Sequence, residues 1–232
     1  MTNSSIPFPA PPPQSEAELL ARAQRLAGLT LAELAAISAQ ALPASAQSGK
    51  GWCGQLLEQF LGASAGSLPR PDFTHIGVEL KTLPLNARGQ PKESTYVCTV
   101  PLKDNRHLRW ETSWVRLKLQ RVLWLPLEGD ARIPFAQRRI GTALLWSPNA
   151  EQEAMLKQDW EEHMDRICLG QLETISARDG EVLQIRPKAA HSKVLSPSCG
   201  SDGAPSQTLP RGFYLRSQFT RTILQQHYAV YT

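Results

Sequence analysis

Between residues 52 and 82 the spacing of apolar residues changes from a helical to a strand period, which restricts the chain to folds that combine both elements. The first part carries an apolar stripe at helical spacing, made of Trp52, Leu56, Leu57, Phe60 and Leu61. Small residues then fill positions 62–67. From 76 to 82 the pattern alternates, with Ile76, Val78 and Leu80 on one face and Gly77, Glu79 and Lys81 on the other. This stretch predicts a helix, a turn and a strand.

The same two patterns recur along the rest of the chain. Ser15-x-x-Glu18 and Thr30-x-x-Glu33 predict two helix starts, and Ser147-Pro148 predicts the start of a long helix that ends at Gly170. Strand patterns cover residues 94–100, 121–127, 143–146, 172–178, 181–186 and 213–215, and a last helix follows them. Asp179-Gly180 predicts a hairpin between 172–178 and 181–186, and the Ser/Gly/Pro-rich residues 195–210 are expected to form a mobile loop. We predict an α/β fold with a mixed or antiparallel sheet flanked by helices.

Residues 1–14 are expected to form a proline-rich flexible arm that frays, and residues 15–232 a single domain. With 232 residues, 41% of them apolar, the chain can bury a sizeable core, and no apolar run suggests a membrane span. The N-terminus lacks the features of a secretion signal. The four cysteines include no Cys-x-x-Cys pair, which argues against a zinc site and a disulfide framework. We expect reduced thiols and a cytoplasmic protein.

The charges are unevenly distributed, although the net charge is only +4. Residues 147–165 carry six acids against one base, Lys157. Residues 186–221 carry one acid, Asp202, against these bases: Arg186, Lys188, Lys193, Arg211, Arg216 and Arg221. The basic block is a candidate phosphate-binding surface, and a merely solvated face would leave the same pattern.

Pro71-Asp72 and Glu79-Leu80-Lys81 supply the residue types that phosphodiester hydrolysis needs. Magnesium takes oxygen ligands, often only one or two carboxylates, which Asp72 and Glu79 can provide. Residues two apart on a strand share a face, so Lys81 lies beside Glu79, where it can orient or deprotonate a water. Gly77 leaves room on that face. The alternative is an ordinary turn and edge strand, because such short patterns recur by chance.

Longer strings occur in the order found in a known family, and the chain resembles the MutH family of mismatch-repair endonucleases over roughly residues 15–230. The strings that carry this resemblance lie at 50–52, 56–58, 61–67, 77–82, 110–113, 121–124, 169–171, 184–189 and 208–215. Residues 1–14 and 195–207 carry no matching string, and Tyr96, Trp114 and Gln120 differ from the residues that the family leads us to expect.

The resemblance implies a restriction-endonuclease-like fold with two subdomains around a DNA-binding cleft, a catalytic part at about 15–110 and a DNA-reading part at about 111–232. It implies nicking of the unmethylated strand 5′ to the G of hemimethylated GATC sites in double-stranded DNA. It also implies one or two Mg²⁺ ions, with Mn²⁺ as a substitute, and activation by MutL after MutS has found a mismatch. We expect a monomer that has no contact with membranes.

Carried over by position, the resemblance assigns roles to named residues. The catalytic residues are Asp72, Glu79 and Lys81, and the metal ligands are Asp72, Glu79 and Glu58. The DNA-binding residues are Lys50, Gly51, Tyr96, Lys118, Arg186, Pro187, Lys188 and Tyr214. Arginine is the commonest reader of guanine, and an aromatic wall at Tyr214 could reject the methyl group of a methylated adenine; the alternative for Tyr214 is a core-anchored tyrosine.

Two other functions would use the same residues. A non-catalytic DNA-binding module could keep the fold, although it would be free to lose any of Asp72, Glu79 and Lys81. A stand-alone GATC restriction endonuclease would need to cut both strands, usually by dimerising, and the chain shows no evident dimerisation segment.

Overall fold

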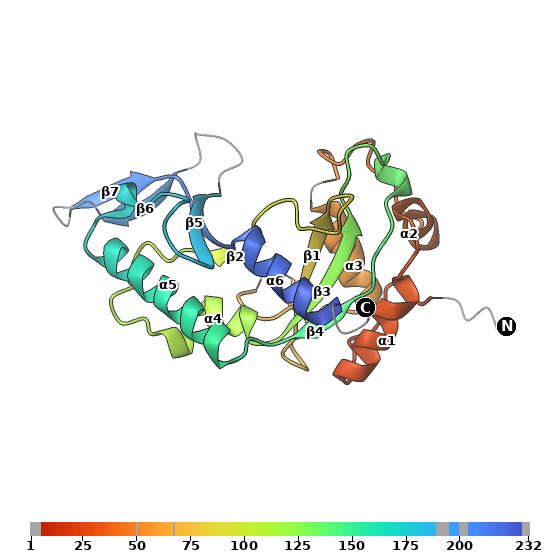
Figure 1. Cartoon of the computed structure of the whole chain (residues 1–232), viewed down its shortest axis with the longest axis horizontal. Coiled ribbons are helices and arrows are strands. Elements are labelled where there is room, and N and C mark those ends of the chain that lie inside the picture. Colours follow the sequence, from red (N-terminus) through yellow and green to blue (C-terminus); the bar gives the residue numbers. More distant parts are fainter. Residues whose placement is uncertain (1–5, 50, 67, 189–194, 200–203, 229–232) are drawn as a thin grey trace. The chain divides into compact units, whose positions relative to one another are not determined.

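The computed structural model describes residues 6–49, 51–66, 68–188, 195–199 and 204–228 (Figure 1). The chain divides into two compact units. Unit 1 comprises residues 1–92 and 121–147, and unit 2 comprises residues 93–120 and 148–232. Within the described ranges, no helix is both long and apolar enough to cross a membrane.

Three helices form the first part of unit 1, at the positions that the sequence predicts: α1 (Glu16–Leu26), α2 (Leu31–Ser38) and α3 (Trp52–Leu61). Thr30 and Glu33 form a complete capping box at the start of α2. At the start of α1 the Ser15 hydroxyl accepts the N–H of Glu18, but the Glu18 carboxylate accepts the N–H of Gln14 instead of closing the box.

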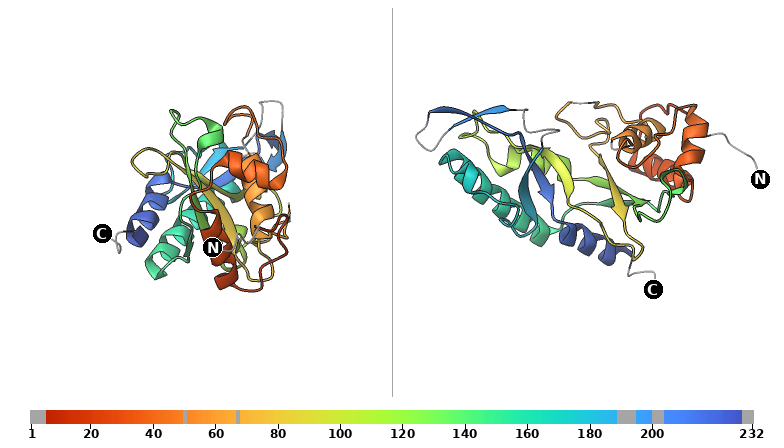
Figure 2. Two further views of the ribbon diagram at one scale, coloured as in Figure 1. Left: turned by 90° about the vertical axis from the view of Figure 1, so that its right-hand side faces the viewer. Right: turned by 90° about the horizontal axis from the view of Figure 1, so that it is seen from above.

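The sheet of unit 1 contains β1 (Glu79–Leu85), β3 (Val122–Glu128) and β4 (Leu144–Trp146), in the order β1-β3-β4. β1 runs parallel to β3, which runs antiparallel to β4. The three helices cover one face of this sheet (Figure 2), and the core between them includes Leu80, Leu123 and Leu125. Because side chains alternate along a strand, Glu79 and Lys81 belong to the opposite face of β1.

The proline-rich segment forms no helix, as its prolines predict, but residues 8–11 are not a frayed arm. The Phe8 ring lies 4.7 Å from the Phe60 ring of α3, measured between centroids. The N–H of Ala10 donates to the Gln59 carbonyl at 2.9 Å, and the Arg22 guanidinium donates to the Pro11 carbonyl. A ring contact and a hydrogen bond with α3, together with a hydrogen bond from α1, therefore hold this segment, and the expectation of fraying is wrong for these residues.

Unit 2 has its own sheet of three antiparallel strands, β2 (Thr95–Thr99), β8 (Arg211–Leu215) and β5 (Leu183–Pro187), in the order β2-β8-β5. Its helices are α4 (Trp114–Leu119), α5 (Ala150–Cys168) and α6 (Ser217–Tyr228). A separate two-stranded ribbon pairs β6 (Ser196–Cys199) with β7 (Pro205–Thr208). Single 3-10 turns occur at Trp110–Thr112 and Leu172–Thr174 in unit 2, and at Phe135–Gln137 in unit 1.

Two expectations about unit 2 are wrong. Residues 172–178 form no strand, and β5 pairs with β8 rather than with a hairpin partner, because side chains of α5 bind the turn at 176–183. Within 195–210 the described residues form the β6–β7 ribbon rather than an irregular loop. The broader prediction, a mixed α/β architecture with small sheets flanked by helices, is confirmed. The single domain and the DNA-binding cleft stay predictions.

Candidate active site

A tight turn brings Asp72 and Glu79 to the start of β1. Phe73 and Val78 face each other across this turn, where the N–H of Phe73 donates to the Val78 carbonyl at 2.9 Å. Both side chains are buried in the core of unit 1. Since Val78 bonds to Phe73, β1 begins at Glu79, later than the alternation from residue 76 predicts. Asp72 and Glu79 thus flank a bridge that the core holds in place.

The Asp72 carboxylate is bound to the strand that carries the other two residues of the set. Its Oδ2 accepts the N–H of Leu80 at 2.8 Å. Leu80 lies between Glu79 and Lys81 in the sequence, so this bond joins the Asp-containing turn directly to the Glu-x-Lys segment. A carboxylate that accepts a backbone N–H keeps a defined orientation. The structure therefore brings Asp72, Glu79 and Lys81 together, as the sequence predicts.

Glu79 and Lys81 form a buried ion pair on one face of β1. The Lys81 Nζ lies 2.6 Å from the Glu79 Oε1, and the two side chains are 11% and 2% exposed. The N–H of Glu79 donates to the Arg121 carbonyl, which ties this position to the residue before β3. A carboxylate this deeply buried is costly unless a cation or a metal compensates it. An ordinary solvent-facing edge strand would not bury Glu79, which disfavours that alternative.

The small-residue turn after α3 links Glu58 to Asp72 through the backbone. The Glu58 carbonyl accepts the N–H groups of Gly62 and Ala63, and the Asp72 carbonyl accepts those of Ser64 and Ala65. Gly62 has φ +82°, and a Cβ there would lie 2.1 Å from the Pro11 carbonyl oxygen. Only glycine fits this position without strain.

The carboxylates fit a magnesium site that water and substrate complete. Among the described residues, no three histidine, cysteine, aspartate or glutamate side chains converge as a ready-made metal cage. Magnesium does not need one, because it commonly keeps several waters beside one or two carboxylates. Asp72 and Glu79 could supply those carboxylates, and the metal roles of Asp72, Glu79 and Glu58 all stay predictions.

Lys50 lies outside the described residues, and Gly51 is the N-cap of α3. Gly51 has φ +91°, a conformation that favours glycine, and a Cβ there would meet nothing within 4 Å. The backbone geometry thus explains this glycine without a ligand. Lys118 lies partly buried on α4 in unit 2. The DNA-binding roles of these three residues stay predictions.

The structure gathers four predicted DNA-binding residues on the sheet of unit 2. The Tyr96 and Tyr214 rings meet edge to face, 5.4 Å apart between centroids. The Arg186 guanidinium lies 5.8 Å from the Tyr214 ring centre, and the Lys188 Nζ lies 3.6 Å from the Tyr96 ring centre. Partial burial raises the pKa of the Tyr214 hydroxyl.

Both tyrosines in this cluster are only partly buried, and Arg186 and Lys188 are exposed. Tyr214 is therefore not a fully core-anchored tyrosine. Pro187, the last residue of β5, is exposed beside them and faces Arg211 of β8. The Arg186 guanidinium also donates to the Ser94 hydroxyl at 2.7 Å, which restricts its position. We call Tyr96, Arg186, Lys188 and Tyr214 the aromatic–cation cluster.

The basic block of residues 186–221 is not a uniform phosphate-binding surface. Arg216 donates to the carbonyls of Ala177, Asp179 and Gly180 and so supports a turn. Arg211 is ion-paired with Glu173 at 3.1 Å. Lys193 lies outside the described residues. Among the described bases of this block, only Arg186 and Lys188 are exposed, because Arg211 and Arg216 bind other parts of the protein and Arg221 is partly buried. The phosphate-binding role of the block stays a prediction.

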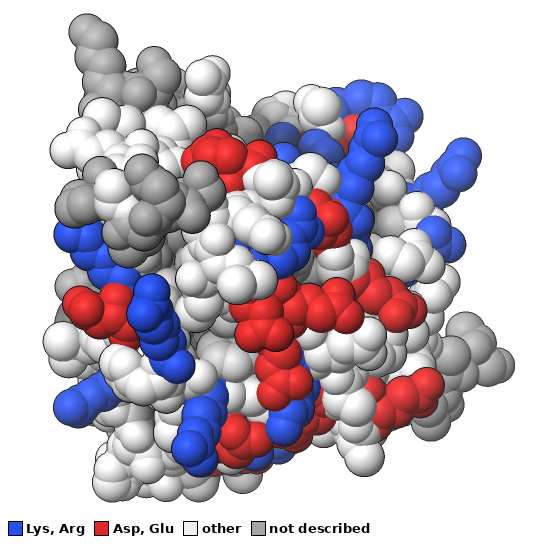
Figure 3. Space-filling view, turned by 90° about the vertical axis from the view of Figure 1, so that its left-hand side faces the viewer, with Lys and Arg blue, Asp and Glu red and all other residues white. Residues whose placement is uncertain are grey.

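The outer surface of α5 carries the opposite charge. It exposes four acids, Glu151, Glu161, Glu162 and Asp165. On the face of the molecule drawn in Figure 3, acidic side chains gather in a band with lysines and arginines around them. Lys157 of α5 is itself paired with Glu111 and Glu161. A surface of this sign repels phosphate, so this side of α5 is not expected to contact DNA.

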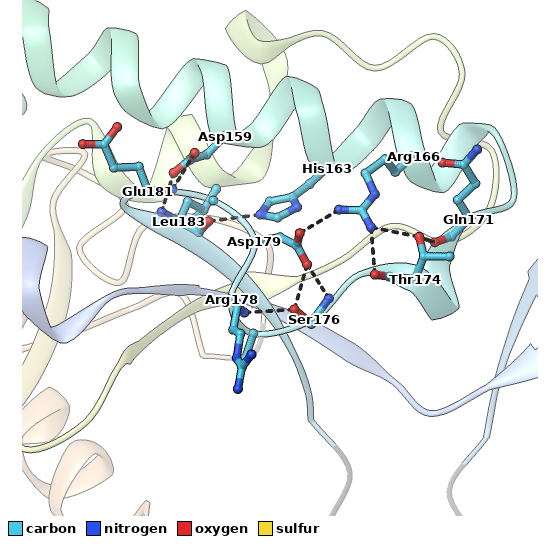
Figure 4. Close-up of polar contacts among 12 residues, drawn as sticks. Asp159, His163, Arg166, Gln171, Thr174, Ser176, Arg178, Asp179, Glu181 and Leu183 are labelled. Carbon is cyan, nitrogen blue, oxygen red and sulfur yellow. Dashed lines mark hydrogen bonds and ion pairs between the residues drawn. The ribbon is translucent and has the colours of Figure 1, made fainter.

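Sequence reasoning missed the side chains of α5 that hold the start of β5 (Figure 4). Asp159 is 4% exposed, and its carboxylate accepts the N–H groups of Glu181, Val182 and Leu183 at 2.7–2.8 Å. The His163 Nε2 lies 3.0 Å from the Leu183 carbonyl oxygen. The sequence does contain one sign of this role. Asp159 and His163 lie one turn apart on the face of α5 that carries its apolar stripe, where a polar side chain needs a partner inside the protein.

The family model "DNA mismatch repair enzyme MutH" matches residues 61–159. Proteins described as "DNA mismatch repair protein MutH" are similar over nearly the whole chain. The one from Serratia proteamaculans is 56% identical over 224 residues, which are 97% of this chain and 98% of that relative. Relatives from Yersinia enterocolitica and Escherichia coli are each 55% identical, over 95% and 94% of this chain and 97% and 96% of their own lengths.

Proposed function

Because the chain belongs to the MutH family of DNA mismatch repair enzymes, which are restriction-endonuclease-like nucleases, we propose that it nicks the unmethylated strand 5′ to the G of hemimethylated GATC sites. The observation that carries the hydrolytic part of this proposal is the buried Glu79–Lys81 pair beside a turn-anchored Asp72. A DNA-binding module without chemistry would not need a carboxylate that is 2% exposed and paired with a lysine beside a second carboxylate, which favours the enzymatic function.

Asp72 and Glu79 would hold the metal ion, with Glu58 as the further candidate ligand. Magnesium bound there would offset charge on the scissile phosphate and favour ionisation of a bound water. Manganese accepts similar oxygen ligands and is expected to substitute. Lys81 is the group that orients the attacking water or receives its proton, since its amine already lies at the edge of the carboxylate set, 2.6 Å from Glu79.

The aromatic–cation cluster is the part of the chain that reads the site. The Arg186 guanidinium has the planar fork that recognises guanine in the major groove, and Lys188 adds a second cation beside it. Tyr214 supplies a wall against the exocyclic amine of adenine. Excluding one methyl group from such a pocket changes the binding free energy by only about 1–3 kcal/mol. Full discrimination between the two strands therefore also requires that a methylated adenine displace the reacting groups.

The partners follow from the same proposal. The chain acts on double-stranded DNA as a monomer, is activated by MutL, and depends on MutS indirectly through the mismatch that MutS recognises. A stand-alone GATC restriction endonuclease is the second candidate, because the same catalytic set could cut both strands.

Cleavage of circular plasmids with one GATC site tests these functions together. Unmethylated, hemimethylated and fully methylated plasmids are incubated with magnesium or EDTA, with and without MutL. We expect nicked circles from the hemimethylated plasmid, only with magnesium, and faster with MutL. Efficient linearisation without MutL would favour the restriction enzyme, and binding without any cleavage would contradict both enzymatic functions.

A further inference from the structure

Gly212 of β8 lies beneath the aromatic–cation cluster, and the absence of its side chain makes room for two rings. A Cβ at this position would lie 2.9 Å from the Tyr214 Cε2 and 3.0 Å from the Tyr96 Cε2. Carbon atoms do not approach this closely without displacement. The backbone does not require glycine here, because Gly212 is not among the residues with positive φ. The two rings account for the glycine.

The strand register places this residue at the centre of the cluster. Gly212 faces Arg186 on β5 on one side and Thr99 on β2 on the other. The Tyr96 hydroxyl lies 3.1 Å from the Thr99 Oγ1. Gly212 is buried, whereas the two tyrosines above it are only partly buried. The rings therefore close over a gap in the sheet surface, and both cations rest against those rings.

We propose that Gly212 is a positioning residue for site recognition. Its missing side chain lets Tyr96 and Tyr214 approach β8, and the rings in turn set where Arg186 and Lys188 meet the bases. This inference rests on the proposed function, in which the cluster reads GATC. It assigns part of the specificity to a residue that touches no base.

Gly212→Ala isolates this effect because it should not harm the fold. The atoms that a new methyl group would meet are the outer carbons of two partly exposed rings, which can swing away. Replacing glycine by alanine at a position with ordinary φ also reduces the freedom of the unfolded chain, which favours folding. The variant should keep or raise the thermal midpoint while displacing the reading side chains.

The test measures single-turnover nicking, with MutL, of a hemimethylated GATC duplex and of duplexes with one altered base pair. We expect Gly212→Ala to lower the ratio of cognate to altered-site rates by about tenfold, the order of one well-placed base contact. The salt dependence of binding should not change, because the number of phosphate contacts is unaffected. In a variant that already carries Tyr96→Ala and Tyr214→Ala, adding Gly212→Ala should not change the ratio of cognate to altered-site rates any further.

The outcomes separate this inference from the proposed function. If Arg186→Ala and Tyr214→Ala lower the ratio but Gly212→Ala does not, the role of Gly212 is overturned and the reading cluster stands. If none of these variants changes the ratio, the reading cluster itself is wrong. If Gly212→Ala loses thermal stability equally with and without the two rings, the backbone requires the glycine, and the inference is again overturned.

Discussion

Replacing Asp159 with alanine removes the carboxylate that holds the start of β5, and it should destabilise unit 2 strongly. The carboxylate accepts three N–H groups, of which those of Val182 and Leu183 are in buried bonds. A buried N–H left without a partner costs about 1–3 kcal/mol, so the two buried groups alone set a loss of about 2–6 kcal/mol. The N–H of Glu181 is only partly buried, so in the variant it can donate to water instead. The variant also no longer buries the charged carboxylate of Asp159, and this gain offsets part of the lost stability.

We therefore expect Asp159→Ala to lower the free energy of unfolding by about 4 kcal/mol, which for a chain of this size lowers the thermal midpoint by about 8–16 °C. Thermal unfolding measures the total, and hydrogen exchange at residues 181–183 localises it. Asp165→Ala is the matched control, since Asp165 is an exposed acid on the same helix. A loss below about 1 kcal/mol, or one equal to that of the control, would refute the reasoning, because the three bonds would then contribute no net stability.

Three further predictions concern other parts of the chain. The pKa of Asp179 is lowered to about 2, mainly because its carboxylate accepts hydrogen bonds from the backbone N–H and hydroxyl of Ser176. The Arg166 guanidinium beside it lowers this pKa further. The stabilising contribution of this carboxylate is present above the unfolded-state pKa near 4 and is lost as pH falls toward 2, so Asp179→Asn should flatten the acid limb of a stability–pH curve measured by denaturant titration. Lys81→Met should slow nicking by at least about a hundredfold while DNA binding persists in a gel-shift assay; near-normal nicking would exclude Lys81 from proton transfer. Gly62→Ala should cost more than about 1 kcal/mol and lower activity, because its Cβ would collide with the Pro11 carbonyl at a positive φ; an unchanged thermal midpoint would contradict this.

Local patterns were sufficient where neighbouring residues determine the structure. The stripe from Trp52 to Leu61 forms α3, the Thr30 capping box forms as predicted, and the Glu-x-Lys alternation places its two side chains in contact. The tight turn at 73–78, which brings Asp72 to this strand, is local too, but the alternation from residue 76 predicts a strand where the second half of the turn lies.

Contacts between distant residues decided the remaining features. The hairpin signal at Asp179-Gly180 failed because Asp159, about twenty residues earlier, captures the N–H groups that a hairpin partner would need. The proline-rich segment packs because Phe60 offers it an apolar surface. The role of Gly212 is invisible in the sequence, since it depends on the register that brings Tyr96 and Tyr214 over the same point of β8.

The central claim is that the carboxylates at the start of β1 perform metal-dependent hydrolysis of DNA. Its most direct test is single-turnover nicking of a hemimethylated GATC duplex by Glu79→Gln across a magnesium titration, with DNA binding measured in parallel. Glu128→Gln is the matched control, because Glu128 ends β3 opposite Leu85, at the other end of the same strand pair. We predict a loss of at least about a hundredfold in nicking for Glu79→Gln, with binding retained and the control unaffected. Normal magnesium-dependent nicking by Glu79→Gln would contradict the account.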